Sequence, residues 1–268
     1  MQGRLWVLLP LLCYCFPAAA AAPTHAQIMT WCNDSDPDLR IRGCSFLIQP
    51  GKEPAKVLAG ALFNQGNAYE AKGQYDLAIQ DFDAAIKRNP NDSAAFYSRG
   101  SAYFAKGQTD SAIQDFDSAI LLDPKDATAF NNRGEAYREK GQQDRAIQDF
   151  DKAITLKPNY TDAFNNRGAA YLAMRQAERA IQDFDSAIKL NPNFADAFRN
   201  RGGAYLVKDQ AGLAIKDFDS AIKLNPRDAM ALYYRSVAKQ STGDSNGIAK
   251  DLAAAKAIDP DIANKLSH

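Results

Sequence analysis

The side chains that could carry chemistry in this 268-residue chain are mostly carboxylates in a recurring Asp-Phe-Asp triplet. Paired carboxylates are candidates for general acid–base catalysis or for cation binding. On a helix, however, residues two apart point about 200° away from each other, so the two carboxylates of one triplet cannot act on one atom. The triplet also occurs five times, whereas an active site is normally built once. We therefore predict ion-paired or solvated helix surface at the aspartate pairs 81/83, 115/117, 149/151, 183/185 and 217/219.

Five arginines recur alongside these triplets. An arginine near a seam between helices needs a partner, so we predict that each one pairs with a nearby aspartate. A row of arginines that binds an anionic ligand is the alternative. The residues concerned are Arg99, Arg133, Arg167, Arg201 and Arg235.

Other kinds of chemistry find little support in the composition. The two histidines, His25 and His268, lie near the ends of the chain, which removes most routes to imidazole catalysis or zinc binding. We find no nucleophile–base pair, metal cluster or phosphate-binding loop, and so predict neither an enzyme nor a cofactor. The formal net charge is zero and no basic stripe is present, so a nucleic-acid partner is not expected.

The elements that position these side chains follow a strict period. Prolines recur every 34 residues from Pro90 to Pro260, and glycines do so from Gly66 to Gly202. Phenylalanines follow the same spacing from Phe82 to Phe218. A fixed period of this length indicates stacked units, none of which can bury its apolar face alone.

The pattern resembles the tetratricopeptide repeat (TPR) family, whose unit is a 34-residue helix–turn–helix. Each repeat has Gly or Ser at position 8, Ala at position 27 and Pro at its end. The sixth repeat departs at Ser236, Lys239 and Ile248, which suits a terminal unit. The resemblance implies an all-α, right-handed α-solenoid of about six helix-turn-helix repeats over residues 59–262, with an N-terminal capping helix.

The same resemblance places positions 5 and 6 of each repeat on a concave groove. Asparagine offers both a donor and an acceptor to the backbone of an extended peptide, so we predict a peptide-binding row there. The alternative is that Asn-Arg-Gly is typical of the family and contacts no ligand. The predicted groove residues are Asn64, Ser98, Asn132, Asn166 and Asn200 at position 6, with Tyr97, Asn131, Asn165 and Arg199 at position 5.

The N-terminus has the features of a secretory signal over residues 1–26, with cleavage after Ala20 or Ala26. Its apolar run of about 12 residues is too short to span a membrane. We therefore expect a periplasmic or secreted protein that does not span the membrane once the signal is removed. Two cysteines remain, and in an oxidising compartment Cys32 and Cys44 are expected to form a disulfide.

Residues 27–58 are interpreted as a cap on the open end of the stack. Asp36-Pro37 predicts a helix start, and the apolar spacing after it resembles that of a second TPR helix. Cys32 would then hold a strand-like tail against this helix. Residues 263–268 form a short C-terminal tail, and whether Asp261 onward makes a covering helix is left open.

Together these features predict a non-catalytic scaffold that binds an extended peptide or protein segment in its concave groove. The alternative hypothesis is a regulatory or docking subunit of an envelope enzyme, perhaps one that modifies glycans, with catalysis carried by another chain. No small-molecule cofactor is expected in either case.

Overall fold

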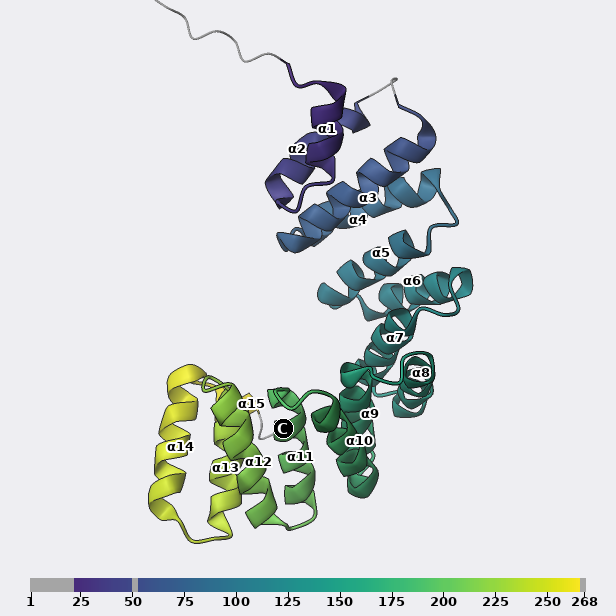
Figure 1. Cartoon of the computed structure of the whole chain (residues 1–268). Helices are drawn as coiled ribbons and strands as arrows, with labels where there is room; N and C mark the ends of the chain where they lie inside the picture. Colours follow the sequence, from purple (N-terminus) through teal and green to yellow (C-terminus); the bar gives the residue numbers. More distant parts are fainter. Residues whose placement is uncertain (1–21, 50–52, 266–268) are drawn as a thin grey trace, which may run out of the picture.

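The computed structural model of this protein describes residues 22–49 and 53–265, and within these ranges the chain forms 15 helices and no strand. Helices α1 to α14 pair into antiparallel hairpins that stack in chain order along a curve (Figure 1). The fold is the predicted right-handed α-solenoid. Their bounds are α1 His25–Cys32, α2 Pro37–Ile48, α3 Ala55–Ala71, α4 Tyr75–Arg88, α5 Ser93–Ala105, α6 Thr109–Leu122, α7 Ala127–Glu139, α8 Gln143–Leu156, α9 Thr161–Ala173, α10 Ala177–Leu190, α11 Ala195–Val207, α12 Ala211–Leu224, α13 Ala229–Gln240, α14 Ser245–Ile258 and α15 Ile262–Lys265.

Six hairpins lie where the six repeats are predicted, except that the first begins with α3 at Ala55, four residues before the predicted boundary at residue 59. These hairpins are α3–α4, α5–α6, α7–α8, α9–α10, α11–α12 and α13–α14. The second helix of each hairpin ends two residues before a repeat proline, which cannot continue a helix. An aspartate then caps several of the helices that follow, as where Asp126 accepts hydrogen bonds from the amides of Thr128 and Ala129. The period in the sequence thus marks both helix ends.

Close approach of the two helices in a hairpin depends on the glycine at position 8. A Cβ atom on Gly134 would lie 2.7 Å from Cε1 of Phe150, and the corresponding glycines face their phenylalanines in the same way. Phe150 is completely buried, as are the alanines at positions 20 and 27, Ala146 and Ala153. The core is therefore a column of phenylalanine rings, each seated on a glycine.

The turns inside the hairpins are the same in shape but not in sequence. Gly73, Gly107 and Gly141 have φ values between 69° and 72°, as expected for glycines that end a helix. In the fourth and fifth repeats Arg175 (φ 59°) and Asp209 (φ 57°) take the same left-handed conformation. Side chains with a Cβ pay a conformational cost there that glycine avoids.

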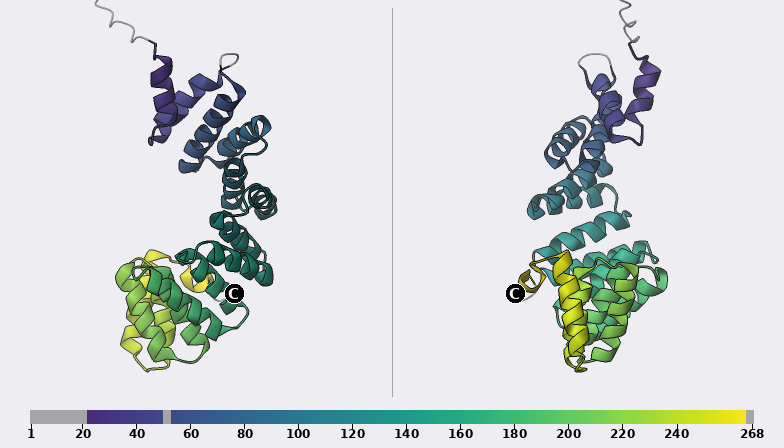
Figure 2. Two further views of the ribbon diagram at one scale, coloured as in Figure 1. Left: turned by 45° about the vertical axis from the view of Figure 1, so that its right-hand side comes forward. Right: turned by 90° about the vertical axis from the view of Figure 1, so that its left-hand side faces the viewer.

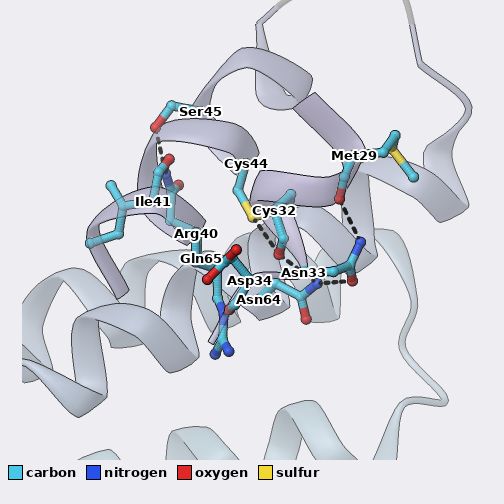
Figure 3. The surroundings of a disulfide bond; sticks show 10 residues. All are labelled: Met29, Cys32, Asn33, Asp34, Arg40, Ile41, Cys44, Ser45, Asn64 and Gln65. Atoms are coloured by element: carbon cyan, nitrogen blue, oxygen red, sulfur yellow. Dashed lines mark hydrogen bonds between the residues drawn. A yellow bond between two sulfur atoms is a disulfide. The ribbon is translucent and has the colours of Figure 1, made fainter. Parts of the chain in front are cut away.

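The N-terminal cap is a helical hairpin of its own, α1 and α2, closed by the predicted disulfide between Cys32 and Cys44 (Figure 3). Asp36 caps α2 and Pro37 occupies its first turn, as predicted. The expected strand-like tail before Cys32 is wrong, because this segment is helix α1. A capping box between Thr24 and Gln27 starts α1 and explains why so short a helix forms.

This helix bears on the predicted signal, most of which lies outside the described residues. Ala26 is within the first turn of α1, so cleavage after it would remove Thr24 and its capping bonds. Cleavage after Ala20 would leave the capping box intact. Both the signal and its cleavage site stay predictions.

At the other end, α15 covers the last hairpin. Ile262 is 3% exposed and packs with Ala229, Leu232 and Ala255. The tail thus includes a short covering helix, although residues 266–268 fall outside the described part. Among the described helices, none is long and apolar enough to cross a membrane.

Candidate protein-interaction groove

The inner face of the solenoid is lined by the first helix of each hairpin. Within the described ranges, α5 contacts α7, α7 contacts α9, and α9 contacts α11, whereas the second helices of successive hairpins do not contact one another. The first helices are therefore the more closely spaced set, which places them on the concave side of the curve. Figure 2 shows this curvature from two further directions.

The asparagines predicted to bind peptide form a ladder along these inner helices. Each position-6 amide donates to the position-5 side chain of the preceding repeat. Asn132 Nδ2 lies 2.8 Å from the Tyr97 hydroxyl. Asn166 Nδ2 lies 3.2 Å from Asn131 Oδ1, and Asn200 Nδ2 lies 2.9 Å from Asn165 Oδ1. The sequence predicted the row but not these bonds, because they join residues 35 apart that only the superhelix brings together.

The ladder fixes the orientation of each carboxamide. Asn131 and Asn165 are buried, while Asn132, Asn166 and Asn200 are half-buried at the surface of the groove. One N–H of each position-6 amide is used within the protein, which leaves its second N–H for a ligand. Asn132 Oδ1 accepts from Asn131, but the side-chain oxygens of Asn166 and Asn200 accept no hydrogen bond from the described residues. Oriented amides of this kind lose little conformational entropy on binding.

Two other predicted groove residues serve the protein's own structure. Asn64 donates to the Cys32 carbonyl and to Asn33 Oδ1, so the cap takes the place of a preceding repeat (Figure 3). Arg199 is held by Asp196 at 2.8 Å and by Asp228 at 2.7 Å, and its charge is neutralised there. Ser98 is half-buried at the remaining place in the row.

The recurring arginines pair with nearby aspartates, as predicted. In the third repeat, Arg133 makes a two-point contact with Asp149, with Nε–Oδ2 at 2.8 Å and Nη2–Oδ1 at 2.7 Å. Its third nitrogen, Nη1, reaches Asp117 of the preceding repeat at 2.6 Å. The arrangement is repeated at Arg99, Arg167, Arg201 and Arg235.

Each arginine therefore joins two repeats rather than binding an outside anion. Two-point pairing of guanidinium and carboxylate is the strongest form of this contact. The first aspartate of each later triplet is buried, not solvated, and burial raises the pKa of Asp149 while Arg133 opposes the rise. The second aspartate of the triplet stays half-exposed. No cluster of acidic, cysteine or histidine side chains suited to a metal ion occurs in the described residues.

The first repeat breaks this pattern. Gln65 stands where the later repeats have arginine, and its amide donates instead to Ser45 Oγ at 2.6 Å and to the Ile41 carbonyl. Asp81 is thereby left without an arginine, and its Oδ2 is buried with no partner among the described residues. Burial raises the pKa of this carboxyl to about 6. In the sequence, this exception is marked by glutamine at repeat position 7, where the later repeats have arginine.

Comparison with known proteins agrees with this architecture. Four tetratricopeptide repeat models match the chain, over residues 63–127, 116–148, 134–174 and 161–194. The repeated helical hairpin, the curved stack and these matches define a helical repeat protein. Residues 63–194 thus match the tetratricopeptide repeat family, as the sequence indicated.

Solved structures show the same fold. The chain is 27% identical to the MamA protein over 64% of this chain and 93% of that one, with a TM-score of 0.56. It is 24% identical to YrrB, described as a TPR protein with an unusual peptide-binding site, over 70% and 95% of the two chains with a TM-score of 0.56. A tetratricopeptide repeat protein from Parabacteroides merdae gives a TM-score of 0.71 at 17% identity over 87% and 91%. A search of curated proteins found no match to the sequence.

Proposed function

We propose that this protein is a scaffold that binds an extended peptide or protein segment along its concave groove. The observation that carries the proposal is the row of oriented amides on the inner helices. Asn166 and Asn200 each present an unused side-chain oxygen and a second N–H to the groove. An extended backbone offers the complementary N–H and C=O groups at regular intervals.

Two further features support a protein ligand. The groove has no cluster of unpaired cations among the described residues: Arg199 is neutralised, the recurring arginines pair with aspartates, and the single Arg138 on α7 lies 4.0 Å from Glu135. A neutral polar row suits a peptide backbone better than an anionic small molecule. The description of YrrB as a protein with a peptide-binding site is consistent with the same use of the fold.

The test is selection from a displayed library of random peptides on the purified full chain. We expect the wild type to enrich a related set of sequences, and an Asn132/Asn166/Asn200→Ala variant to bind the enriched peptides at least about tenfold more weakly, since each lost hydrogen bond costs about 1 kcal/mol. The chain offers a matched control in Gln114/Gln148/Gln182→Ala, which removes three exposed amides from the outer helices. Equal loss in both triple variants would contradict groove binding.

We also propose that the protein works in an oxidising compartment, either the periplasm or outside the cell. The signal-like N-terminus and the disulfide between Cys32 and Cys44 support this. Cell fractionation and N-terminal sequencing of the mature chain test the proposal. We expect the protein in the envelope or medium, beginning at residue 21. Recovery of an uncleaved cytoplasmic chain would contradict it.

A further inference from the structure

The polarity of the inner face varies along the groove. In the fourth to sixth repeats the inner face holds a pocket of about 390 Å³ between α9, α11 and α13. Its wall is mostly apolar and is formed in part by Leu172, Gly203, Leu206, Val207, Met230 and Tyr234. This volume lies at the lower end of the range for ligand pockets, and it suits a single large side chain better than a whole small molecule.

The equivalent place two repeats earlier is polar. The positions 68 residues before Gly203 and Leu206 hold Glu135 and Arg138. Those 68 residues before Met230 and Tyr234 hold Asp162 and Asn166. The apolar character is therefore a local feature of the C-terminal half, not a consequence of the repeat.

The exposure of these side chains is also unusual. Val207 is 58% exposed and Met230 is 37% exposed, although both lie on the inner face. Scattered exposed apolar residues are normal, so the exposure of Val207 and Met230 matters here because both border one apolar pocket. A Cβ atom on Gly203 would meet nothing within 4 Å, so this glycine leaves open space that the fold itself does not need.

The groups at the rim limit the chemistry of the occupant. Arg199 lines the pocket but is neutralised by Asp196 and Asp228, so it offers no net charge to an acidic side chain. Asn200 also lines the pocket, and its side-chain oxygen is free to accept a backbone N–H. A neutral apolar side chain next to an extended backbone satisfies both features.

We infer that the segment bound in the groove inserts a large aliphatic side chain, such as leucine, isoleucine or methionine, into the pocket between α9, α11 and α13. This inference rests on the proposed function and names the side chain for which the groove is specific. The asparagine row holds the backbone of the segment, and the pocket selects one side chain. Loss of about one buried aliphatic side chain corresponds to an affinity change on the order of tenfold or more.

The test compares Gly203→Leu with Gly212→Leu on the full chain. Both glycines have open space around their Cβ positions, but Gly203 opens into the pocket and Gly212 lies in the first turn of the outer helix α12. Peptides enriched by the wild type should share an aliphatic residue at one position. Changing that residue to alanine should weaken binding about tenfold in wild type and in Gly212→Leu, but less than twofold in Gly203→Leu.

The possible outcomes separate the two proposals. Enrichment of peptides without an aliphatic position, or an unchanged alanine effect in Gly203→Leu, would overturn the pocket inference and leave groove binding intact. Failure of the wild type to enrich any peptide would overturn both. A dimer seen by sedimentation and lost in Gly203→Leu would assign the pocket to a second copy, and tighter peptide binding after deletion of residues 266–268 would assign it to the chain's own tail. Either result would also overturn the inference.

Discussion

At the scale of single residues, one aspartate position has opposite environments in different repeats. Asp149 is buried against Arg133 with two hydrogen bonds, whereas Asp81 is partly buried with one oxygen unpartnered. The difference follows from Gln65, which bonds the cap instead of the aspartate. A carboxylate without a counter-charge in such a place opposes folding when it is ionised.

Asp81 should therefore make stability depend on pH. Burial raises its pKa to about 6, above the ordinary value of 3.8. Between these values the folded chain binds a proton that the unfolded chain releases, so this residue's contribution to stability is present at low pH and is lost as the pH rises through about 6. We expect Asp81→Asn to raise the urea midpoint at pH 7 and to flatten the pH dependence between about 4 and 6.

Asp149→Asn is the matched control for that prediction. It alters the same repeat position but takes a charged partner from Arg133, so we expect a lower urea midpoint at pH 7. If the urea midpoint changed in the same direction in both variants, Asp81 and Asp149 would not differ in their effect on stability.

Removing one of the recurring arginines should be costly, because it leaves the buried carboxylate of its partner aspartate unpaired. The side chains of Arg133 and Asp149 are only 18% and 8% exposed. Breaking a buried pair typically costs about 3–5 kcal/mol. We expect Arg133→Met to lose close to 3 kcal/mol of unfolding free energy, and the double variant Arg133→Met/Asp149→Leu to lose clearly less. An equal loss in the two would point to packing rather than charge.

At the scale of elements, the hairpin turns offer a direct test of backbone strain. Arg175 has φ 59°, whereas the equivalent Gly141 has φ 72°. Glycine populates this region freely, while a side chain with a Cβ pays about 1 kcal/mol or more. We expect Arg175→Gly to raise the thermal midpoint and Gly141→Arg to lower it, as calorimetry would show. A fall in both would mean that the side chain of Arg175 matters more than its backbone.

The cap should depend on its disulfide. Linking residues 32 and 44 closes a short loop, for which the chain-entropy model gives about 3 kcal/mol. Since α1 is only eight residues long, we expect Cys32→Ser/Cys44→Ser to increase hydrogen exchange in α1 and α2 while α7 to α10 stay protected. Uniformly faster exchange throughout the solenoid would contradict a local role.

Much of the element structure was predictable from the sequence, for physical reasons. The 34-residue period sets where each helix stops, because proline and glycine act locally on the backbone. The arginine–aspartate pairs also followed, since a charge at a helix seam needs a partner. Helix α1 was not predicted, although Thr24 and Gln27 carry its capping signal, because eight residues are too few to form a stable helix without packing.

At the scale of the whole molecule, the contacts that line the groove could not be predicted from the sequence. The bonds from Asn166 to Asn131 and from Asn200 to Asn165 depend on the superhelical curve. So does the pocket beside Val207, whose walls come from three helices. Local patterns specify one hairpin, whereas the groove is a property of the stack.

The sequence also departs from the repeat pattern at the two ends of the stack. At the N-terminal end Gln65 replaces arginine and bonds the neutral Ser45 of the cap. At the C-terminal end Ala253 stands in the register of the second triplet aspartate, so no carboxylate is offered to a following arginine. The arginine–aspartate pairs therefore run from Arg99 to Arg235 among the described residues.

The central claim is that the inner face holds the ligand, and photo-crosslinking tests it most directly. A photoreactive amino acid would be placed at Val207 on the inner face or at Gln182 on the outer helix α10, both of them exposed. A labelled peptide enriched by the wild-type protein would then be irradiated with each variant. We predict crosslinking from position 207 and none from position 182. Crosslinking from position 182 alone would place the binding surface on the convex side and contradict the account.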